Sequence, residues 1–158
     1  KGPAYMRMGR SKFPVITPAG QTFEIGKASV MREGSDVTIV ACGQLVVSAL
    51  EAADKLAASG VSAEVINMST VKPLDGETLL RSVRKTGAAV TAEEHSIIGG
   101  LGSAVCEFLS ENLPVPVCRV GTKDIFGESG EADELLVKYG LTADGIADAA
   151  VKAVSKKK

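Results

Sequence analysis

Hydrophobic positions along the chain change their spacing in a regular way from Asp36 onward. Residues 37–42 form a short, almost entirely apolar run, which is typical of a strand buried on both faces of a parallel sheet. After Gly43, apolar residues recur at helical spacing until Ser59 and Gly60 end the segment. The pattern therefore predicts a buried strand followed by an amphipathic helix.

The same alternation of strand-like and helical spacing continues to the end of the chain. Further strands are predicted at residues 61–68, 88–93 and 115–120. Further helices are predicted after Pro73 with Asp75 as N-cap, from about Gly100 to Asn112, near residues 131–139 and at residues 142–155. Gly140 and Thr142 are suited to end one of the last two helices and to cap the other.

Residues 23–32 also have strand-like spacing, but only residues 33–36 separate them from the strand at 37–42. So short a connection cannot join two parallel neighbours, so we expect an antiparallel strand in the same sheet. The other strands are joined through helices, which favours parallel pairing. The sequence thus predicts an α/β fold: a three-layer sandwich with a mostly parallel five-stranded sheet, one antiparallel strand, and helices on both faces.

Composition fits one folded domain and excludes several function classes. The chain has 158 residues, of which 45% are hydrophobic and 23% charged. Lys and Arg total 18 against 19 acidic residues, so we expect no binding to nucleic acid or to an anionic membrane. No apolar run reaches the roughly 18 residues that span a bilayer. We therefore expect a cytoplasmic protein, and we interpret residues 156–158 as a solvated lysine tail.

The three cysteines give no sign of a metal or redox site. Cys42, Cys106 and Cys118 make an odd number, they lack paired ligand spacing, and each lies among apolar residues. We expect buried, reduced thiols, which again favours a cytoplasmic location.

The first twenty residues have a different pattern from the rest. Residues 2–10 combine a strand-like apolar run with two arginines, and Pro14, Pro18 and Gly20 then indicate a linker. The chain starts at Lys1 rather than at Met, and we expect it to be a fragment. Residues 1–20 are therefore interpreted as the end of a preceding domain and a linker, and residues 21–155 as the domain itself.

The richest chemistry follows the predicted strand at residues 88–93, at the edge of an open α/β sheet where ligands bind. Two carboxylates and the only histidine of the chain, Glu93, Glu94 and His95, end this strand. A glycine cluster then leads into a helix N-terminus; its glycines are Gly99, Gly100 and Gly102. Free N–H groups at a helix N-terminus can hold an anion. Alternatively, the glycines let the helix pack closely on the sheet. The spacing is not the dinucleotide-binding fingerprint.

For three polar side chains, the sequence allows both a functional and a structural role. His95 could carry protons or bind phosphate, or it could be an interface or hydrogen-bonding residue. Arg7 and Arg10 could bind a phosphate through their guanidinium groups, or they could be solvated or paired with carboxylates. The residues alone do not show a catalytic triad or a metal-ligand spacing.

Four stretches together resemble a known family, the C-terminal domain of transketolases: residues 23–28, 34–43, 65–75 and 93–105. The resemblance covers nearly the whole chain, and these stretches follow one another in the family's order. The same domain ends deoxyxylulose phosphate synthases and the beta chains of 2-oxoacid dehydrogenases. Glu-Glu-His followed by Gly-Gly-Leu-Gly is more similar to the transketolases, including split ones whose C-terminal subunit is a separate polypeptide.

The resemblance implies a transferase of pentose phosphate chemistry, which moves a two-carbon ketol unit between sugar phosphates. Such enzymes use thiamine diphosphate and Mg²⁺, held by a diphosphate-binding and a pyrimidine-binding domain. This chain is then expected to bind neither cofactor, to contain no catalytic or metal-ligating residue, and to be inactive alone. Arg10 stands four residues before Pro14, the place of an arginine that binds the substrate phosphate, and Arg7 is a weaker candidate.

The role that the resemblance implies for the domain is structural. The helices and residues 93–102 are expected to pack against the pyrimidine-binding domain and a second subunit of a homodimer. His95 fits that interface. The alternatives are the C-terminal domain of a 2-oxoacid dehydrogenase beta chain or of a deoxyxylulose phosphate synthase, and, from another class, a stand-alone anion-binding module.

Overall fold

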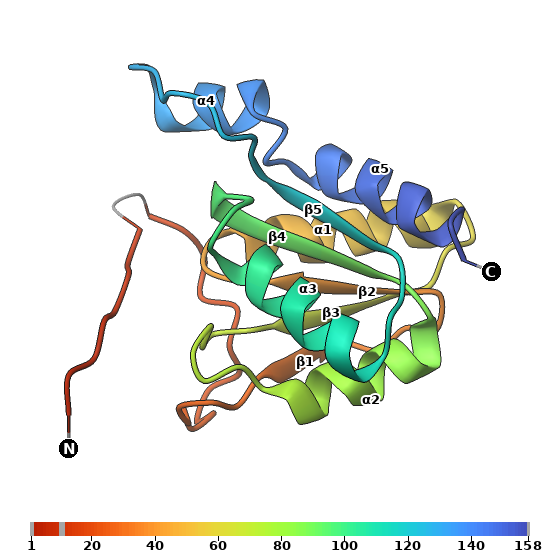
Figure 1. The fold of residues 1–158 in the computed structure, drawn as a ribbon. Coiled ribbons are helices and arrows are strands. Elements are labelled where there is room, and N and C mark those ends of the chain that lie inside the picture. Colours follow the sequence, from red (N-terminus) through yellow and green to blue (C-terminus); the bar gives the residue numbers. More distant parts are fainter. Residues whose placement is uncertain (1, 10–11, 158) are drawn as a thin grey trace.

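A computed structural model describes residues 2–9 and 12–157. It contains a five-stranded sheet with the strand order β1-β3-β2-β4-β5 (Figure 1). The strands are β1 Ser29–Arg32, β2 Val37–Ala41, β3 Ala63–Asn67, β4 Ala89–Ser96 and β5 Val117–Thr122. The helices are α1 Leu45–Ala58, α2 Gly76–Thr86, α3 Leu101–Asn112, α4 Ala132–Lys138 and α5 Ala143–Val154.

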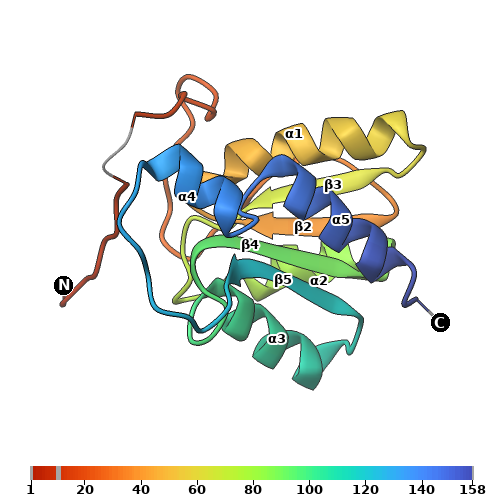
Figure 2. The same ribbon diagram turned by 90° about the horizontal axis from the view of Figure 1, so that it is seen from above.

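Helices cover both faces of the sheet, which confirms the predicted three-layer α/β fold. One apolar cluster joins α1 and α5 to one face, and a second joins α2 and α3 to the other (Figures 1 and 2). Every residue of β2 is buried: Val37, Ile39 and Ala41 lie in the first cluster, Val40 lies in the second, and the Thr38 hydroxyl bonds to Ser82 and Thr86 of α2. Its almost entirely apolar run therefore indicated a central strand correctly.

The first strand is antiparallel, as its short connection to β2 predicts, but its partner is β3 rather than β2. Residues 33–36 cross over the start of β3 to reach β2. At this crossing a Cβ on Gly34 would lie 2.2 Å from the backbone of Ala63 and Glu64, so no side chain fits there. The strand is shorter than expected, because residues 23–28 are irregular. Residues 2–9 and 12–20 likewise form no helix or strand, in contrast to the strand-like pattern near the N-terminus.

Helix boundaries follow the local signals in the sequence. The Asp75 carboxylate accepts a hydrogen bond from the Thr78 amide and caps α2, and the Thr142 hydroxyl accepts one from Gly145 and caps α5. Gly140 has φ of +70° just after α4, a conformation that glycine adopts without strain. The predicted caps and stop are confirmed.

Two further expectations can be compared with the structure. The three cysteines are free, as expected, but each is only partly buried, so the expectation of buried thiols is wrong. None of the helices in the described part of the chain combines the length and the apolar character needed to cross a membrane.

Candidate functional site at the carboxyl edge of the sheet

Strands β2 to β5 are parallel, so their C-terminal ends meet at one edge of the sheet, here called the carboxyl edge. The segments that follow these strands, residues 42–44, 68–75, 97–100 and 123–131, form this edge. Because β1 is antiparallel, residues 23–28 also reach it, where the Gly26 amide donates to the Thr70 hydroxyl over 3.2 Å.

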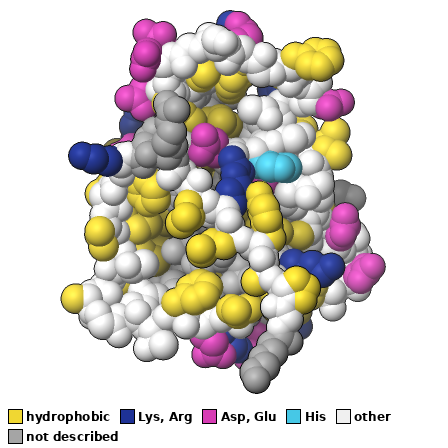
Figure 3. All heavy atoms as spheres, turned by 90° about the vertical axis from the view of Figure 1, so that its left-hand side faces the viewer, with side chains coloured by type: hydrophobic (Ala, Val, Ile, Leu, Met, Phe, Trp, Pro, Cys, Tyr) yellow, Lys and Arg dark blue, Asp and Glu magenta, His cyan; other side chains and the backbone are white. Residues whose placement is uncertain are grey.

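Large apolar side chains are exposed at this edge and in the N-terminal segment, residues 2–9 and 12–20. Figure 3 shows apolar side chains gathered on this face of the molecule. Phe126 is 99% exposed and Ile98 is 58% exposed. The other exposed large apolar residues in these segments are Tyr5, Met6, Met8, Phe13, Val15, Phe23, Ile25, Val71 and Ile125. The exposed apolar side chains of the carboxyl edge mark an interaction surface.

Helix α4 adds to this surface. It lies at the same end of the sheet as the carboxyl edge, and none of its residues is buried (Figure 2). Glu128 joins it to the preceding loop, because its carboxylate accepts hydrogen bonds from Lys138 (2.6 Å) and Tyr139 (3.3 Å). The lysine hydrogen bond and charge hold the pKa of Glu128 below its ordinary value.

A buried carboxylate lies behind the carboxyl edge. Glu93 of β4 is only 3% exposed, and its two carboxylate oxygens accept hydrogen bonds from the amides of Leu101 and Gly102, each over 2.7 Å. These amides open α3, where the helix dipole favours negative charge. Burial, together with the negative charge of Glu93, raises the pKa of the Cys42 thiol to about 11, while Arg7 acts in the opposite direction.

Two glycines make room for this carboxylate. A Cβ on Gly100 would lie 2.1 Å from Oε2 of Glu93. A Cβ on Gly102 would lie 2.9 Å from the Thr91 hydroxyl and 3.2 Å from Oε1 of Glu93. Both positions therefore require glycine because the helix N-terminus packs directly on β4. Among the described residues, Oγ1 of Thr91 is the one buried side-chain polar atom without a hydrogen-bond partner.

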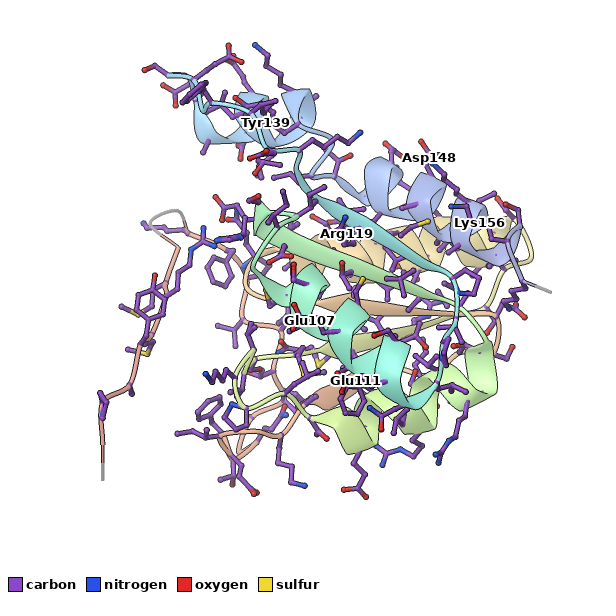
Figure 4. The ribbon with its side chains drawn as sticks, viewed as in Figure 1. Glu107, Glu111, Arg119, Tyr139, Asp148 and Lys156 are labelled. Atoms are coloured by element: carbon purple, nitrogen blue, oxygen red, sulfur yellow. The ribbon has the colours of Figure 1, made fainter. Side chains whose placement is uncertain are left out.

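Residues 97–100, here called the glycine turn, are fixed by several hydrogen bonds. The Ile97 amide donates to the Thr122 carbonyl over 3.0 Å, and the Arg119 guanidinium of β5 donates to the Ile97 carbonyl over 2.8 Å (Figure 4). The Gly99 amide donates to the Ser103 hydroxyl over 2.8 Å. The turn is thus attached to β5 and to α3 while it presents Ile98 to solvent.

A thiamine diphosphate site would need several oxygen ligands for Mg²⁺ and free donors for the diphosphate. Within residues 2–9 and 12–157, no group of three or more His, Cys, Asp or Glu side chains could hold a metal ion. The first amides of α3 are bonded to Glu93. The described residues therefore do not fit this cofactor.

Comparison with known proteins identifies the family of the chain. Residues 26–146 match the family model of the transketolase C-terminal domain. The chain belongs to this family. The fold agrees, because a solved split-gene transketolase, described as an inactive beta4 tetramer, superposes with a TM-score of 0.91. It is 52% identical and covers 94% of this chain, which in turn covers 49% of that protein.

Curated transketolase subunits are also similar over almost the whole chain. The 6-deoxy-6-sulfo-D-fructose transketolase subunit of Clostridium sp. (strain MSTE9) is 53% identical over 99% of this chain and 48% of its own length. An apulose-4-phosphate transketolase subunit of Phocaeicola vulgatus is 40% identical over 98% of this chain and 49% of its own length. The transketolase C-terminal domain here thus spans about half the length of these relatives.

The structure brings together some of the residues that the sequence pattern selected. Gly100 and Gly102 contact Glu93, and Nδ1 of the exposed His95 lies 2.8 Å from the Ser96 carbonyl and 3.9 Å from the Glu93 carboxylate. The Glu94 side chain is exposed. Arg7 is exposed in the N-terminal segment, and Arg10 lies outside the described residues.

The buried Glu93 was not selected as a site residue, although a signal was present. In the sequence Ala-Val-Thr-Ala-Glu of β4, it is a carboxylate that ends a buried run, and glycines follow where a helix begins. Arg119 and Thr91 gave no such signal, because their roles depend on neighbours from other elements.

Proposed function

We propose that this chain is the C-terminal part of a transketolase that transfers a two-carbon ketol unit between sugar phosphates. Residues 1–20 are the end of the pyrimidine-binding domain and a linker, and residues 21–155 are the C-terminal domain. The observation that carries this proposal is that transketolase subunits match 98–99% of this chain but are about twice as long. Such an enzyme uses thiamine diphosphate and Mg²⁺, which the proposal assigns to its other domains.

The proposed task of residues 21–155 is assembly. The exposed apolar side chains of the carboxyl edge are suited to contact the pyrimidine- and diphosphate-binding domains and a second subunit of a homodimer. We assign the glycine turn, with Ile98 and His95, to the contact with the second subunit. A solved relative that is 52% identical is described as a tetramer, which supports self-association. The domain alone is expected to be inactive, and a cytoplasmic location stays a prediction.

The activity is tested with the full-length protein, thiamine diphosphate and Mg²⁺. With a ketose phosphate donor and an aldose phosphate acceptor, we expect a new sugar phosphate that is two carbons longer than the acceptor, detected by mass spectrometry. Release of CO₂ from pyruvate without ketol transfer would instead favour a deoxyxylulose phosphate synthase or a 2-oxoacid dehydrogenase beta chain. Phosphate binding by the 158-residue chain alone would favour the anion-binding module, for which the amides bonded to Glu93 give little support.

The substrate role proposed for Arg10 is tested in the same assay. Because a charged hydrogen bond to phosphate contributes roughly 1.5–3 kcal/mol, Arg10→Ala is expected to raise KM for phosphorylated substrates by about 10- to 100-fold. Arg7→Ala is expected to have a smaller effect. Lys12→Ala serves as the control for the loss of a nearby positive charge, and an equal effect of Lys12→Ala and Arg10→Ala contradicts a specific role.

The assembly role is tested through two exposed aliphatic side chains of similar exposure. Ile98 in the glycine turn is 58% exposed, and Val151 on α5 is 53% exposed. Ile98→Lys is expected to weaken self-association of the full-length protein, as measured by mass photometry over a dilution series. Val151→Lys is expected to leave it unchanged, because α5 covers the sheet away from the carboxyl edge. Unchanged association in Ile98→Lys contradicts the proposed subunit contact.

A further inference from the structure

An anion that belongs to the protein itself lies directly beside the glycine turn, at the start of α3. The amides of Leu101 and Gly102 are the first amides of α3, and helical geometry leaves them without carbonyl partners. Glu93 is their acceptor, with one carboxylate oxygen for each amide. The place where an external anion could bind the start of α3 is therefore occupied by the protein's own carboxylate.

The backbone beside the Glu93 carboxylate leaves no room for a side chain at two neighbouring positions. A Cβ on Gly100 or on Gly102 would contact the carboxylate or its neighbour Thr91. A side chain at either position would thus push the start of α3 away from β4. The glycines and the carboxylate form one unit that sets the distance between β4 and α3.

The position of the exposed turn depends on this unit. The glycine turn is only four residues long, and its far end runs directly into Leu101 and Gly102. Its near end is attached to β5 through the Thr122 carbonyl and Arg119. Movement at the α3 end therefore moves Ile98, which lies between the two attachments.

We infer that Glu93 is the positioning residue of the glycine turn, and that its buried charge holds residues 97–100 in the shape that docks Ile98 onto the second subunit. This inference rests on the subunit contact proposed above. Glu93 is 3% exposed, and it acts through the amides of Leu101 and Gly102. The glutamine variant keeps the shape of the side chain, but its amide nitrogen cannot accept a hydrogen bond.

The local effect is measured by amide hydrogen exchange in the full-length protein. In Glu93→Gln, one side-chain oxygen remains as an acceptor, so at least one of the amides of Leu101 and Gly102 is expected to exchange at least about tenfold faster, because amides at the start of a helix have no other partner. Glu94→Gln is the matched control, since it makes the same change at the neighbouring, exposed carboxylate. Unchanged exchange in Glu93→Gln overturns the inference.

The positioning role is measured by a double-mutant cycle on self-association. In the wild type, Ile98→Ala is expected to raise the dissociation constant of the subunits by about tenfold. In the Glu93→Gln background the same change is expected to have about twofold effect or less, because Ile98 is already displaced. Additive effects of the two changes overturn the inference, since a residue that only stabilises the fold would not couple to Ile98.

A second variant covers the case in which Glu93→Gln does not fold. Gly102→Ala places a Cβ 3.2 Å from Oε1 of Glu93 and 2.9 Å from the Thr91 hydroxyl, and so displaces the start of α3 from the carboxylate. It is expected to reduce the effect of Ile98→Ala in the same way, and additivity again overturns the inference. If Ile98→Lys weakens association but neither variant couples to Ile98, the positioning role fails and the proposed subunit contact stands. If Ile98→Lys has no effect, both fail.

Discussion

Asp75 connects two parts of the fold, and its removal should be measurable in the free energy of unfolding. It is 5% exposed. One carboxylate oxygen caps α2 by accepting the Thr78 amide over 3.0 Å, and the other accepts the Ala28 amide over 2.8 Å. Through this second bond the segment before β1 is attached to the start of α2.

The magnitude follows from these two bonds. Loss of an N-cap costs about 1 kcal/mol, and loss of a hydrogen bond to a charged group costs at least about 1.5 kcal/mol. Asp75→Ala should therefore destabilise the chain by about 2.5 kcal/mol, which corresponds to a fall of about 5–10 °C in Tm for a domain of this size. Asp75→Asn loses the negative charge, and its single side-chain oxygen can accept from only one of the two amides. If it still caps α2 it loses the Ala28 bond, so somewhat more than half of this loss is expected.

The contribution of Asp75 should depend on pH in a defined direction. Burial alone would raise the pKa of Asp75, but hydrogen bonds from the amides of Ala28 and Thr78 outweigh it and hold the pKa below its ordinary value. A carboxyl group whose pKa is lowered by folding stabilises the fold above its unfolded pKa, about 3.9, and this stabilisation is lost as the pH falls through the folded value. The difference between wild type and Asp75→Asn should therefore be largest near neutral pH and shrink in acid.

Urea unfolding followed by circular dichroism measures these differences at pH 7 and near pH 3. Asp148→Asn is the control, because Asp148 is exposed on α5 (Figure 4). Its free energy of unfolding should change by less than about 0.5 kcal/mol. Wild-type stability in Asp75→Asn at pH 7, or a loss that persists undiminished in acid, would refute the reasoning.

Two further changes test the buried carboxylates. Gly100→Ala should destabilise the chain by roughly 1–3 kcal/mol, because its Cβ would lie 2.1 Å from the Glu93 carboxylate; thermal unfolding measures this loss. Lys85→Met should lower the urea midpoint, because it removes the cation from Glu64, which is 3% exposed at its side chain. Hydrogen bonds to Glu33 and Glu64 raise the pKa of Lys85, so this difference should persist up to about pH 10.4 and disappear as the pH rises through the folded value.

Each of these changes has a matched control. Gly127→Ala adds the same methyl group where nothing lies within 4 Å, and it should leave Tm nearly unchanged. Lys152→Met removes a lysine from the exposed face of α5 and should not lower the urea midpoint. An equal effect of target and control would show that the contact with Glu93, or with Glu64, contributes little.

Local sequence signals predicted most of the fold. The almost entirely apolar run of β2 indicates a central strand, because a strand covered on both faces has no solvent-facing positions that would carry charged side chains. Asp75 and Thr142 identify helix starts, because their side chains supply the acceptor that a first turn lacks. These signals depend on residues close in sequence, and the structure reproduces them.

The neighbour of β1 could not be predicted in this way. A short connection shows that β1 is not parallel to β2, but it does not show which strand lies between them. That choice depends on the passage of Gly34 over Ala63 and Glu64, about thirty residues further along the chain. A single glycine among polar residues does not indicate which backbone it will cross.

The candidate site was also predicted only in part from the sequence. The glycine turn was recognised from its sequence, but the partner of its amides was not. An external anion and an internal carboxylate use the same N–H groups, so the glycine pattern fits either one. Whether the anion is external or internal depends on how the start of α3 packs on β4. This packing brings the Glu93 carboxylate to amides eight and nine residues further along the chain.

An internal anion also agrees with an interface at this edge of the sheet. Backbone amides that are buried without an acceptor carry a large free-energy cost, so a helix N-terminus with free amides has to stay in contact with water or a ligand. Because Glu93 satisfies these amides inside the domain, the outer side of the glycine turn needs no bound anion. It can carry the exposed Ile98 beside an apolar surface, and a second subunit can cover it without leaving the amides of Leu101 and Gly102 unpaired. On this reasoning, the proposed assembly role requires the buried Glu93 carboxylate, because the carboxylate satisfies the amides that a second subunit would cover.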